Sequence, residues 1–316
     1  MPGESISTPF TTIRRQSVIL EKILSIFVII AIGFAAKKVK AVDAAFLRGL
    51  SAFMMNIALP FAFIASLDRS IPKSVLPELG MMALWSIAIH GAAIGFASIA
   101  YRRFPEGQRK ILSFITVFTN CAFMGLPVAQ SVAGTKGIMF ASIYNLMYGI
   151  LIYTYGVSLF QEKSDPDKWR KVLLNPGIVA IFIGIVLWFL PFALPSFMLE
   201  SMSLMAKLQT PLAMFVVGAN IANIRIGKIL AGKALLTAMG VRLLGIPLAV
   251  YAVIRLTGSS GLAPEIALLM TAMPAGAQTV VIAEKMGGDS AFASEIVFAT
   301  TIASIVTIPF FAGLVA

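Results

Sequence analysis

The sequence is poor in the side chains that most often build disulfides and metal centres. Its 316 residues include one cysteine, Cys121, and one histidine, His90. A single cysteine excludes an intrachain disulfide and any Cys-x-x-Cys redox or metal motif. A single histidine excludes the paired histidines of the usual zinc sites. We therefore expect a chain without a metal site and without a cofactor.

Charged residues are also scarce. They make up 12% of the sequence, while hydrophobic residues make up 59%, and the mean hydropathy is +0.92. A soluble domain keeps about a quarter of its residues charged, because its surface must face water. This composition indicates that much of the surface faces hydrocarbon and that the chain is an all-α polytopic membrane protein.

The net charge of +11 raises the question of a nucleic-acid partner. The basic residues, however, lie in short clusters between apolar runs, which is typical of the loops of membrane proteins. We therefore expect a lipid bilayer and no nucleic acid as the partner of this surface. Arg14 and Arg15 precede the first apolar run as in a signal peptide, but no small-residue cleavage site follows. We interpret this run as a retained helix.

Ten segments are long and apolar enough to cross a membrane. A helix needs about 20 largely apolar residues to span ~30 Å of hydrocarbon. The segments that meet this requirement, numbered 1 to 10 in chain order, are Val18–Ala36, Ala45–Leu67, Leu79–Tyr101, Ile111–Gly134, Gly137–Phe160, Pro176–Phe197, Met202–Ile224, Ile229–Leu256, Ala263–Ala283 and Ala291–Val315. The sequence therefore predicts ten transmembrane helices.

Basic residues are distributed unevenly between these segments. The loops after predicted helices 1, 3, 5, 7 and 9 hold 16 lysines and arginines, whereas the opposite side, with both termini, holds 8. An excess of basic residues marks the cytoplasmic side of a membrane. We therefore expect both termini on the non-cytoplasmic side of a multi-pass protein of the plasma membrane, which in bacteria is the cell inner membrane.

The longest polar connection, residues 161–175, divides the chain into two halves of five predicted helices, residues 1–160 and residues 176–316. We expect this connection to be a cytoplasmic loop. Because each half has an odd number of helices, the second half enters the membrane from the opposite side. Such an arrangement is the inverted repeat of many transporters.

Prolines recur at corresponding positions of the two halves. Pro60 and Pro211 lie in predicted helices 2 and 7, and Pro127 and Pro274 lie in predicted helices 4 and 9. Proline inside a helix removes a backbone donor and clashes with the preceding turn. With glycines nearby, Pro127 and Pro274 predict unwound stretches. At membrane depth such stretches are tolerated where they are buried in protein or line a wet cavity.

Two breaks in equivalent helices favour a binding site at their level in the membrane. The freed helix N-termini offer N–H groups and a positive dipole end to an anion. Asn120 and Gln278 place a side-chain amide beside each break. The alternative is that the prolines are ordinary kinks and the amides merely join helices. We favour the binding site, because the two breaks lie at matching positions of the two halves and each proline has a side-chain amide within 7 residues.

Ordered motifs along nearly the whole chain resemble the auxin efflux carrier family. They are Asn56–Pro60, the Asn-x4-Gly-x-Pro stretch Asn120–Pro127, Asn175-Pro176, Pro211–Gly218, Arg242–Pro247 and Met273–Gly287. The resemblance implies ten helices in two inverted repeats, with broken helices 4 and 9 that cross. It also implies a scaffold domain from helices 1, 2, 6 and 7, a transport domain from helices 3–5 and 8–10, and a homodimer formed through the scaffold domain.

Members of this family export or exchange small organic anions. The resemblance therefore implies a secondary-active or facilitative transporter of the elevator type, and no enzymatic activity is expected. The expected substrate is a mono- or dicarboxylate or an auxin-like acid. The residues expected to bind it are Asn120, Gly125, Pro127, Pro274, Gly276 and Gln278, with Leu59, Gln209 and Thr210 on the scaffold side.

A sodium-coupled symporter of the bile-acid type is the main alternative, because such proteins resemble this chain through Gly276-Ala277-Gln278. They use an acidic residue two positions before that glycine as a sodium ligand, and this chain has Pro274 there. Sodium coupling is therefore not expected.

Arg242 and His90 lie inside predicted helices 8 and 3 and are candidates for a charge or proton role. A buried arginine either attracts a substrate anion or pairs with carboxylates and carbonyl groups. We favour the structural role for Arg242, because it lies outside the broken helices. Histidine titrates near neutral pH, but we favour a packed, hydrogen-bonded side chain for His90 as well.

An intramembrane protease is the alternative from another functional class. Gly258–Gly261 has the letters of a Gly-x-Ser-Gly serine-protease motif, but the required histidine must come from a later helix, and His90 comes earlier. Gly287-Gly288-Asp289 resembles aspartyl proteases, yet no second aspartate lies within a predicted helix. We interpret both motifs as turns.

Overall fold

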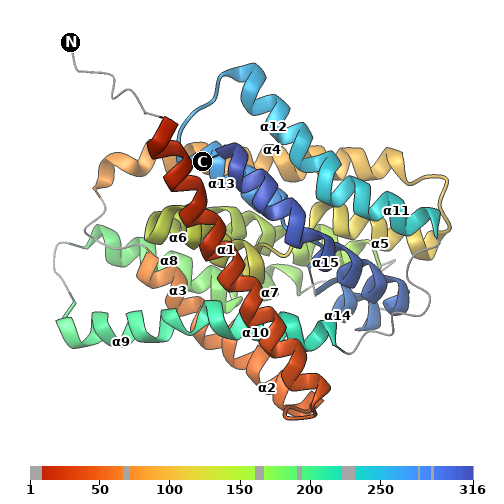
Figure 1. The fold of residues 1–316 in the computed structure, drawn as a ribbon, viewed down its shortest axis with the longest axis horizontal. Coiled ribbons are helices and arrows are strands. Elements are labelled where there is room, and N and C mark those ends of the chain that lie inside the picture. The colour runs from red at the N-terminus through yellow and green to blue at the C-terminus, as the bar shows by residue number, and fades with distance from the viewer. Residues whose placement is uncertain are drawn as a thin grey trace.

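The chain folds into helices. The computed structural model describes residues 9–66, 72–160, 167–190, 194–222, 232–276, 278–285 and 288–315. Within these ranges the elements are helices, and one isolated bridge joins Thr119 and Ala275 (Figure 1). Six helices there are long and apolar enough to cross a membrane: Ala44–Ser66, Lys73–Ala100, Cys121–Gly156, Ser196–Ile221, Lys233–Thr257 and Ser290–Val315. Two apolar helices are shorter, Pro176–Phe189 and Leu262–Thr271. The prediction of an all-helical, multi-pass membrane protein is confirmed.

The first part of the chain begins with a long helix that ends in two lysines. Lys37 and Lys38 occupy the last turn of α1, where positive charge is favoured by the helix dipole. Asp43 then caps the next helix by accepting a hydrogen bond from Phe46 N over 2.7 Å. The elements in this part are α1 (Pro9–Lys38), α2 (Ala44–Phe53), η1 (Met54–Ala58), α3 (Leu59–Ser66), η2 (Lys73–Val75) and α4 (Leu76–Ala100).

A sharp reversal follows in the next group of helices, which are α5 (Glu106–Val117), η3 (Cys121–Gly125), α6 (Leu126–Leu151) and η4 (Ile152–Gly156). Gly134 has φ 60° and ψ −141° inside α6, a conformation that glycine adopts without steric cost. A Cβ on Gly137 would lie 2.0 Å from Ala129 O, although eight residues of straight helix extend about 12 Å. The chain therefore folds back at Gly134, which agrees with the boundary expected between predicted helices 4 and 5.

The remaining elements correct several predicted boundaries. Residues 161–175 were expected to be a loop, but α7 lies within them, and the helix expected over Pro176–Phe197 ends at Phe189. The next helix begins at Ser196, six residues before the expected Met202, because polar residues at its start do not prevent helix formation. These elements are α7 (Lys168–Leu173), α8 (Pro176–Phe189), α9 (Ser196–Lys207), α10 (Gln209–Ile221), α11 (Lys233–Gly240), η6 (Val241–Gly245), α12 (Ile246–Thr257), α13 (Leu262–Thr271), α14 (Gln278–Lys285) and α15 (Ser290–Val315).

Three prolines lie at the same distance from a π-helical segment. Pro60, Pro127 and Pro247 are each the second residue after a five-residue π-helix, η1, η3 and η6 respectively. A proline lacks the N–H of the helix ladder, and its ring clashes with the carbonyl group four residues earlier. A wider turn relieves this clash, and such π-bulges are frequent at functional sites. These prolines therefore widen their helices without ending them.

The helices pack into two groups with contacts between them. The first group contains α1, α2, α3, α8, α9 and α10, and the second contains α4, α5, α6 and α11 to α15. Figure 1 shows α9 and α10 along one edge of the molecule and α4 along the opposite edge, with α1 crossing in front. Contacts of α6 with α3 and α8, and of η3 with α10, join the groups.

The close contact between α1 and α10 depends on two glycines. A Cβ on Gly33 of α1 would lie 2.1 Å from Phe215 O, and a Cβ on Gly218 of α10 would lie 1.8 Å from Ile30 O. The two helices are thus in backbone contact at both positions, as expected for membrane helices that associate through small residues.

Candidate functional site

The two broken helices cross at their breaks. Phe118 ends α5 in an extended conformation, and the bridge between Thr119 and Ala275 is antiparallel. Asn120 N donates a hydrogen bond to Pro274 O over 2.8 Å. Gly276 fits closely at this crossing: a Cβ there would lie 3.1 Å from Thr119 O, so the backbone of Thr119 would have to move by a few tenths of an ångström to admit it. Two unwound stretches far apart in the sequence thus pair through their backbones.

The position of the first break differs from the expectation. We expected unwinding at Gly125 and Pro127, but both lie inside the continuous helix η3–α6, and the non-helical residues are Phe118 to Asn120. The reason is that the π-helical turn of η3 accommodates Pro127. In the other broken helix the extended stretch does include the expected residues, Pro274 and Gly276, between α13 and α14. Gly125 packs against α13, because a Cβ added at this position would lie 2.9 Å from Met270 Sδ.

Arg242 holds the C-terminal ends of both broken helices. Its side chain is 1% exposed. Nη1 donates to Thr116 O over 3.0 Å and to Ile115 O over 3.3 Å, both in the last turn of α5. Nη2 donates to Thr271 O, in the last residue of α13. Arg242 lies outside the broken helices. Its hydrogen bonds nevertheless join the ends of α5 and α13 at the crossing.

Four helix ends with opposite partial charges meet at this crossing. A helix C-terminus carries about half a negative charge and an N-terminus about half a positive charge. The single charge of Arg242 therefore matches the two C-termini of α5 and α13. Among the described residues, no acidic side chain is paired at the N-termini of η3 and α14. The one salt bridge in those ranges joins Lys110 and Glu106, outside the crossing. These two N-terminal ends leave the crossing with about one positive charge available to an anion.

Asn120 lies at the N-terminus of η3 with a free side chain. The residue is 4% exposed, and its backbone carbonyl accepts hydrogen bonds from Met124 N and Gly125 N. In the part of the chain that the structure describes, its side-chain amide has no hydrogen-bond partner. The neighbouring hydroxyl of Thr119 is likewise buried without a partner there. The Asn120 amide, with two donors and an acceptor, is therefore available for further hydrogen bonds at the crossing.

Gln278 occupies the equivalent place at the start of α14, and a tyrosine holds it. Tyr148 OH donates to Gln278 Oε1 over 2.9 Å. The ring of Tyr148 packs edge-on against Phe118 of the other break, with centroids 5.4 Å apart. Tyr148 therefore joins the two breaks and orients the Gln278 amide, which leaves its NH₂ group to face other partners.

The first residues of α10 contact the helix that follows Asn120. Gln209 Nε2 donates to Ala122 O over 3.0 Å. In η3 the bonds run from residue i+5 to residue i, as from Leu126 N to Cys121 O. The donor for Ala122 O would therefore come from Pro127, which has no N–H, and Gln209 takes its place. The next residue of α10, Thr210, donates through Oγ1 to Oε1 of Gln130, eight residues after Ala122, over 3.0 Å.

Leu59 and His90 are placed less directly at the crossing. Leu59 is buried at the start of α3, which packs against α6, α8 and α9. His90 is buried on α4, where Nδ1 lies 2.7 Å from Ser86 O and the ring packs 4.9 Å from that of Tyr144. Its Nε2 has no hydrogen-bond partner in the described part of the protein. These contacts are those of a packed histidine, the role favoured from the sequence.

Sequence reasoning missed three polar residues at the crossing. Tyr148 contacts Gln278, Thr300 Oγ1 of α15 accepts a hydrogen bond from Ala275 N over 3.2 Å, and Asn145 Oδ1 accepts one from Cys121 Sγ over 3.2 Å. Their common signal is a polar side chain in the middle of an apolar helix, which in a membrane usually faces protein. The described residues include no group of three or more His, Cys, Asp or Glu placed to hold a metal ion.

Residues 18–312 match the profile of the family described as membrane transport protein. The chain belongs to this family. It is the auxin efflux carrier family that the sequence motifs resemble. Membrane transport protein relatives include an uncharacterized transporter of Methanothermobacter thermautotrophicus, 25% identical over 92% of this chain and 96% of that protein. Another is an uncharacterized transporter of Methanocaldococcus jannaschii, which is 21% identical over 92% of this chain and 96% of that protein. Protein ECM3 of Saccharomyces cerevisiae is 23% identical over 46% of this chain and 26% of its own length.

Membership in this family establishes the general activity. The protein is a membrane transporter that acts on small molecules within a bilayer. Its family is one of transporters, which argues against the protease alternative.

Proposed function

We propose that this membrane transport protein moves a small organic anion, such as a mono- or dicarboxylate or an auxin-like acid, by binding it at the helix crossing. The observation that carries the proposal is Asn120, a buried residue at a helix N-terminus whose side-chain amide has no hydrogen-bond partner among the described residues. A carboxylate there would accept hydrogen bonds from the free N–H groups of η3 and from the Asn120 side chain. Gly276 and Gln278 would complete the site from the other break.

The balance of charge at the crossing supports an anion over a cation. Arg242 is neutralised by the two helix C-termini that it contacts, and the two N-termini leave about one positive charge. A single carboxylate matches that charge. Because no lysine or arginine side chain is needed as a direct ligand, the empty site carries only the partial charges of the helix ends and no fixed cation. This arrangement would favour reorientation of the unloaded carrier.

The proposed architecture is ten helices in two inverted repeats, with elevator-type movement. The division of the helices into two packed groups supports a scaffold of α1 to α3 and α8 to α10 and a mobile transport domain of α4 to α6 and α11 to α15. The hydrogen bonds of Gln209 and Thr210 with Ala122 and Gln130 would lie between these domains. A homodimer through the scaffold, both termini outside, and a location in the plasma membrane belong to the same proposal.

Transport is proposed to be independent of sodium, because Pro274 stands where sodium symporters of similar architecture use an acidic residue. Reconstituted protein in liposomes should take up radiolabelled mono- or dicarboxylates at the same rate when choline replaces sodium at constant pH and membrane potential. An uptake rate that collapses in choline would instead support the sodium-symporter alternative. Failure to transport any carboxylate, with transport of a cation or neutral solute, would refute the anion site.

A further inference from the structure

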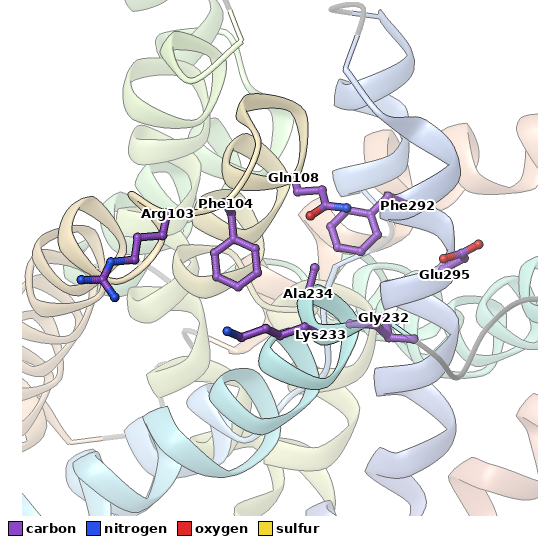
Figure 2. A pocket seen from close by; sticks show the side chains of 9 residues that line it. Arg103, Phe104, Gln108, Gly232, Lys233, Ala234, Phe292 and Glu295 are labelled. Carbon is purple, nitrogen blue, oxygen red and sulfur yellow. The ribbon is translucent and has the colours of Figure 1, made fainter.

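A second site lies away from the helix crossing, at the end of the molecule that the distribution of basic residues assigns to the cytoplasm. A cavity of about 420 Å³ is lined by residues from the α4–α5 turn and from the starts of α5, α11 and α15. Figure 2 shows Phe104, Gln108 and Phe292 around the space next to Ala234, the second residue of α11. Its volume falls in the range of small-molecule sites, roughly 300–1,000 Å³.

Two cations line this cavity, Arg103 and Lys233. Among the described residues neither has an acidic partner, and the one salt bridge there joins Lys110 and Glu106 at 2.7 Å. That pairing lowers the pKa of the Glu106 carboxyl and removes Lys110 from the local excess of positive charge. Glu295 also lines the cavity, but in Figure 2 its carboxylate points away from Lys233.

The start of α11 adds backbone donors to these side chains. Its N-cap is Gly232, which has no side chain to cap the helix. The first intrahelical bond of this helix is from Leu236 N to Gly232 O. The N–H groups of Lys233, Ala234 and Leu235 therefore have no helical partners, and these residues line the cavity. Because α11 continues through η6 into α12, they stand at the positive end of a long helix dipole.

Exposed apolar side chains lie close in sequence to the residues that line the cavity, and in a membrane protein such side chains are expected to face lipid. Ile99, in the last turn before Arg103, is 66% exposed, and Leu236, just after Lys233, is 61% exposed. Exposed apolar residues next to free cations are the arrangement of a boundary between acyl chains and headgroups. Gln108 and the aromatic rings then provide a polar and an apolar wall for a headgroup.

We propose that this cavity binds a phosphate group, either on the headgroup of an anionic lipid or as a free phosphate anion. Arg103 and Lys233 pair with its charge, and the N–H groups at the start of α11 donate hydrogen bonds to its oxygens. This site is separate from the proposed substrate site at the helix crossing. The group that it recognises is a phosphate, whereas the proposed substrate is a carboxylate.

Binding to the purified full-length protein tests this site without any transport measurement. Native mass spectrometry would be used to titrate phosphatidylglycerol, with phosphatidylcholine as the zwitterionic comparison. Inorganic phosphate would be titrated separately by isothermal calorimetry. The test variant is Arg103→Gln with Lys233→Gln. The matched control is Arg48→Gln with Arg170→Gln, which removes two charges from exposed residues elsewhere.

The wild type and the control are expected to bind the phosphate-bearing probe at least tenfold more tightly than the test variant. Preference for phosphatidylglycerol with no response to inorganic phosphate identifies a lipid headgroup, and a response to inorganic phosphate identifies a free anion. Equal binding by the test variant, or equal loss in the control, overturns the proposal. Asn120→Ala should leave this binding unchanged, so the result is independent of the proposed substrate site.

Discussion

Arg242 and Thr271 are joined by a hydrogen bond from the guanidinium Nη2 to the carbonyl oxygen at the end of α13. The same side chain reaches Thr116 O at the end of α5. One buried cation thus fastens the negative ends of two broken helices, while the positive ends remain open beside Asn120 and Gln278. This division of charge is the basis of the proposed anion site.

Replacing Asn120 by alanine should weaken substrate binding by about 10- to 150-fold, since one hydrogen bond to a charged group contributes about 1.5–3 kcal/mol. The thermal stability should change little, because the amide has no protein partner among the described residues. Affinity would be measured by scintillation proximity with the substrate found in the uptake screen, and stability by melting in detergent.

Asn175→Ala is the matched control for that variant. The Asn175 side chain caps α8 by accepting bonds from Gly177 N and Ile178 N over 3.0 and 3.2 Å. Its loss should cost about 1 kcal/mol of stability and leave affinity unchanged. If Asn120→Ala binds substrate normally, the site lies elsewhere.

Arg242→Gln should lower the melting temperature by several degrees and reduce the yield of folded protein. A buried carbonyl that loses its donor costs about 1–3 kcal/mol, and Arg242 serves carbonyls on two helices. Arg242→Lys should rescue only in part, because an ammonium lacks the fork of donors that spans both helix ends. Arg255→Gln, an exposed arginine on α12, is the control and should melt like the wild type. A fully stable Arg242→Gln that no longer binds substrate would assign the arginine to the substrate instead.

Gln209→Leu should change the rate of transport more than the affinity. The substitution removes the donor to Ala122 O, a neutral hydrogen bond that contributes about 1 kcal/mol, or about fivefold in an equilibrium. If this contact lies between a fixed and a moving domain, its loss alters the balance of carrier states. The expected result is a changed kcat with a KM within about twofold of wild type. A large rise in KM with an unchanged kcat would indicate that Gln209 binds the substrate directly.

Gly33→Ala and Gly218→Ala should each lower the free energy of unfolding by about 1–3 kcal/mol, the usual cost of overpacking. In both cases the new Cβ would overlap a backbone oxygen of the neighbouring helix, which cannot move like a flexible side chain. Gly95→Ala is the control, because nothing lies within 4 Å of a Cβ at that position of α4. Melting of the three variants in the same detergent gives the comparison. Equal melting temperatures would show that α1 and α10 separate more easily than their contacts suggest.

Local features of the sequence were sufficient to predict the class of protein. Long apolar runs and scarce charge depend only on composition, and they correctly predicted a helical membrane protein. The motifs around Asn120 and Pro274 correctly indicated the family and the two helices that are broken. These properties are readable because a lipid solvent requires each membrane-spanning segment to satisfy its own backbone hydrogen bonds.

The position of the first break and the contacts at the crossing depend on how neighbouring helices pack. The sequence located the first break at Gly125 and Pro127, whereas the π-helical turn of η3 keeps those residues helical and the break lies at Phe118 to Asn120. The contact of Tyr148 with Gln278 and the reach of Arg242 to α5 and α13 depend on which helices are adjacent. Apolar helices present similar surfaces to one another and to lipid, so composition does not specify their partners. Close packing of small residues and a few polar contacts specify them, and these exist only once the helices have assembled.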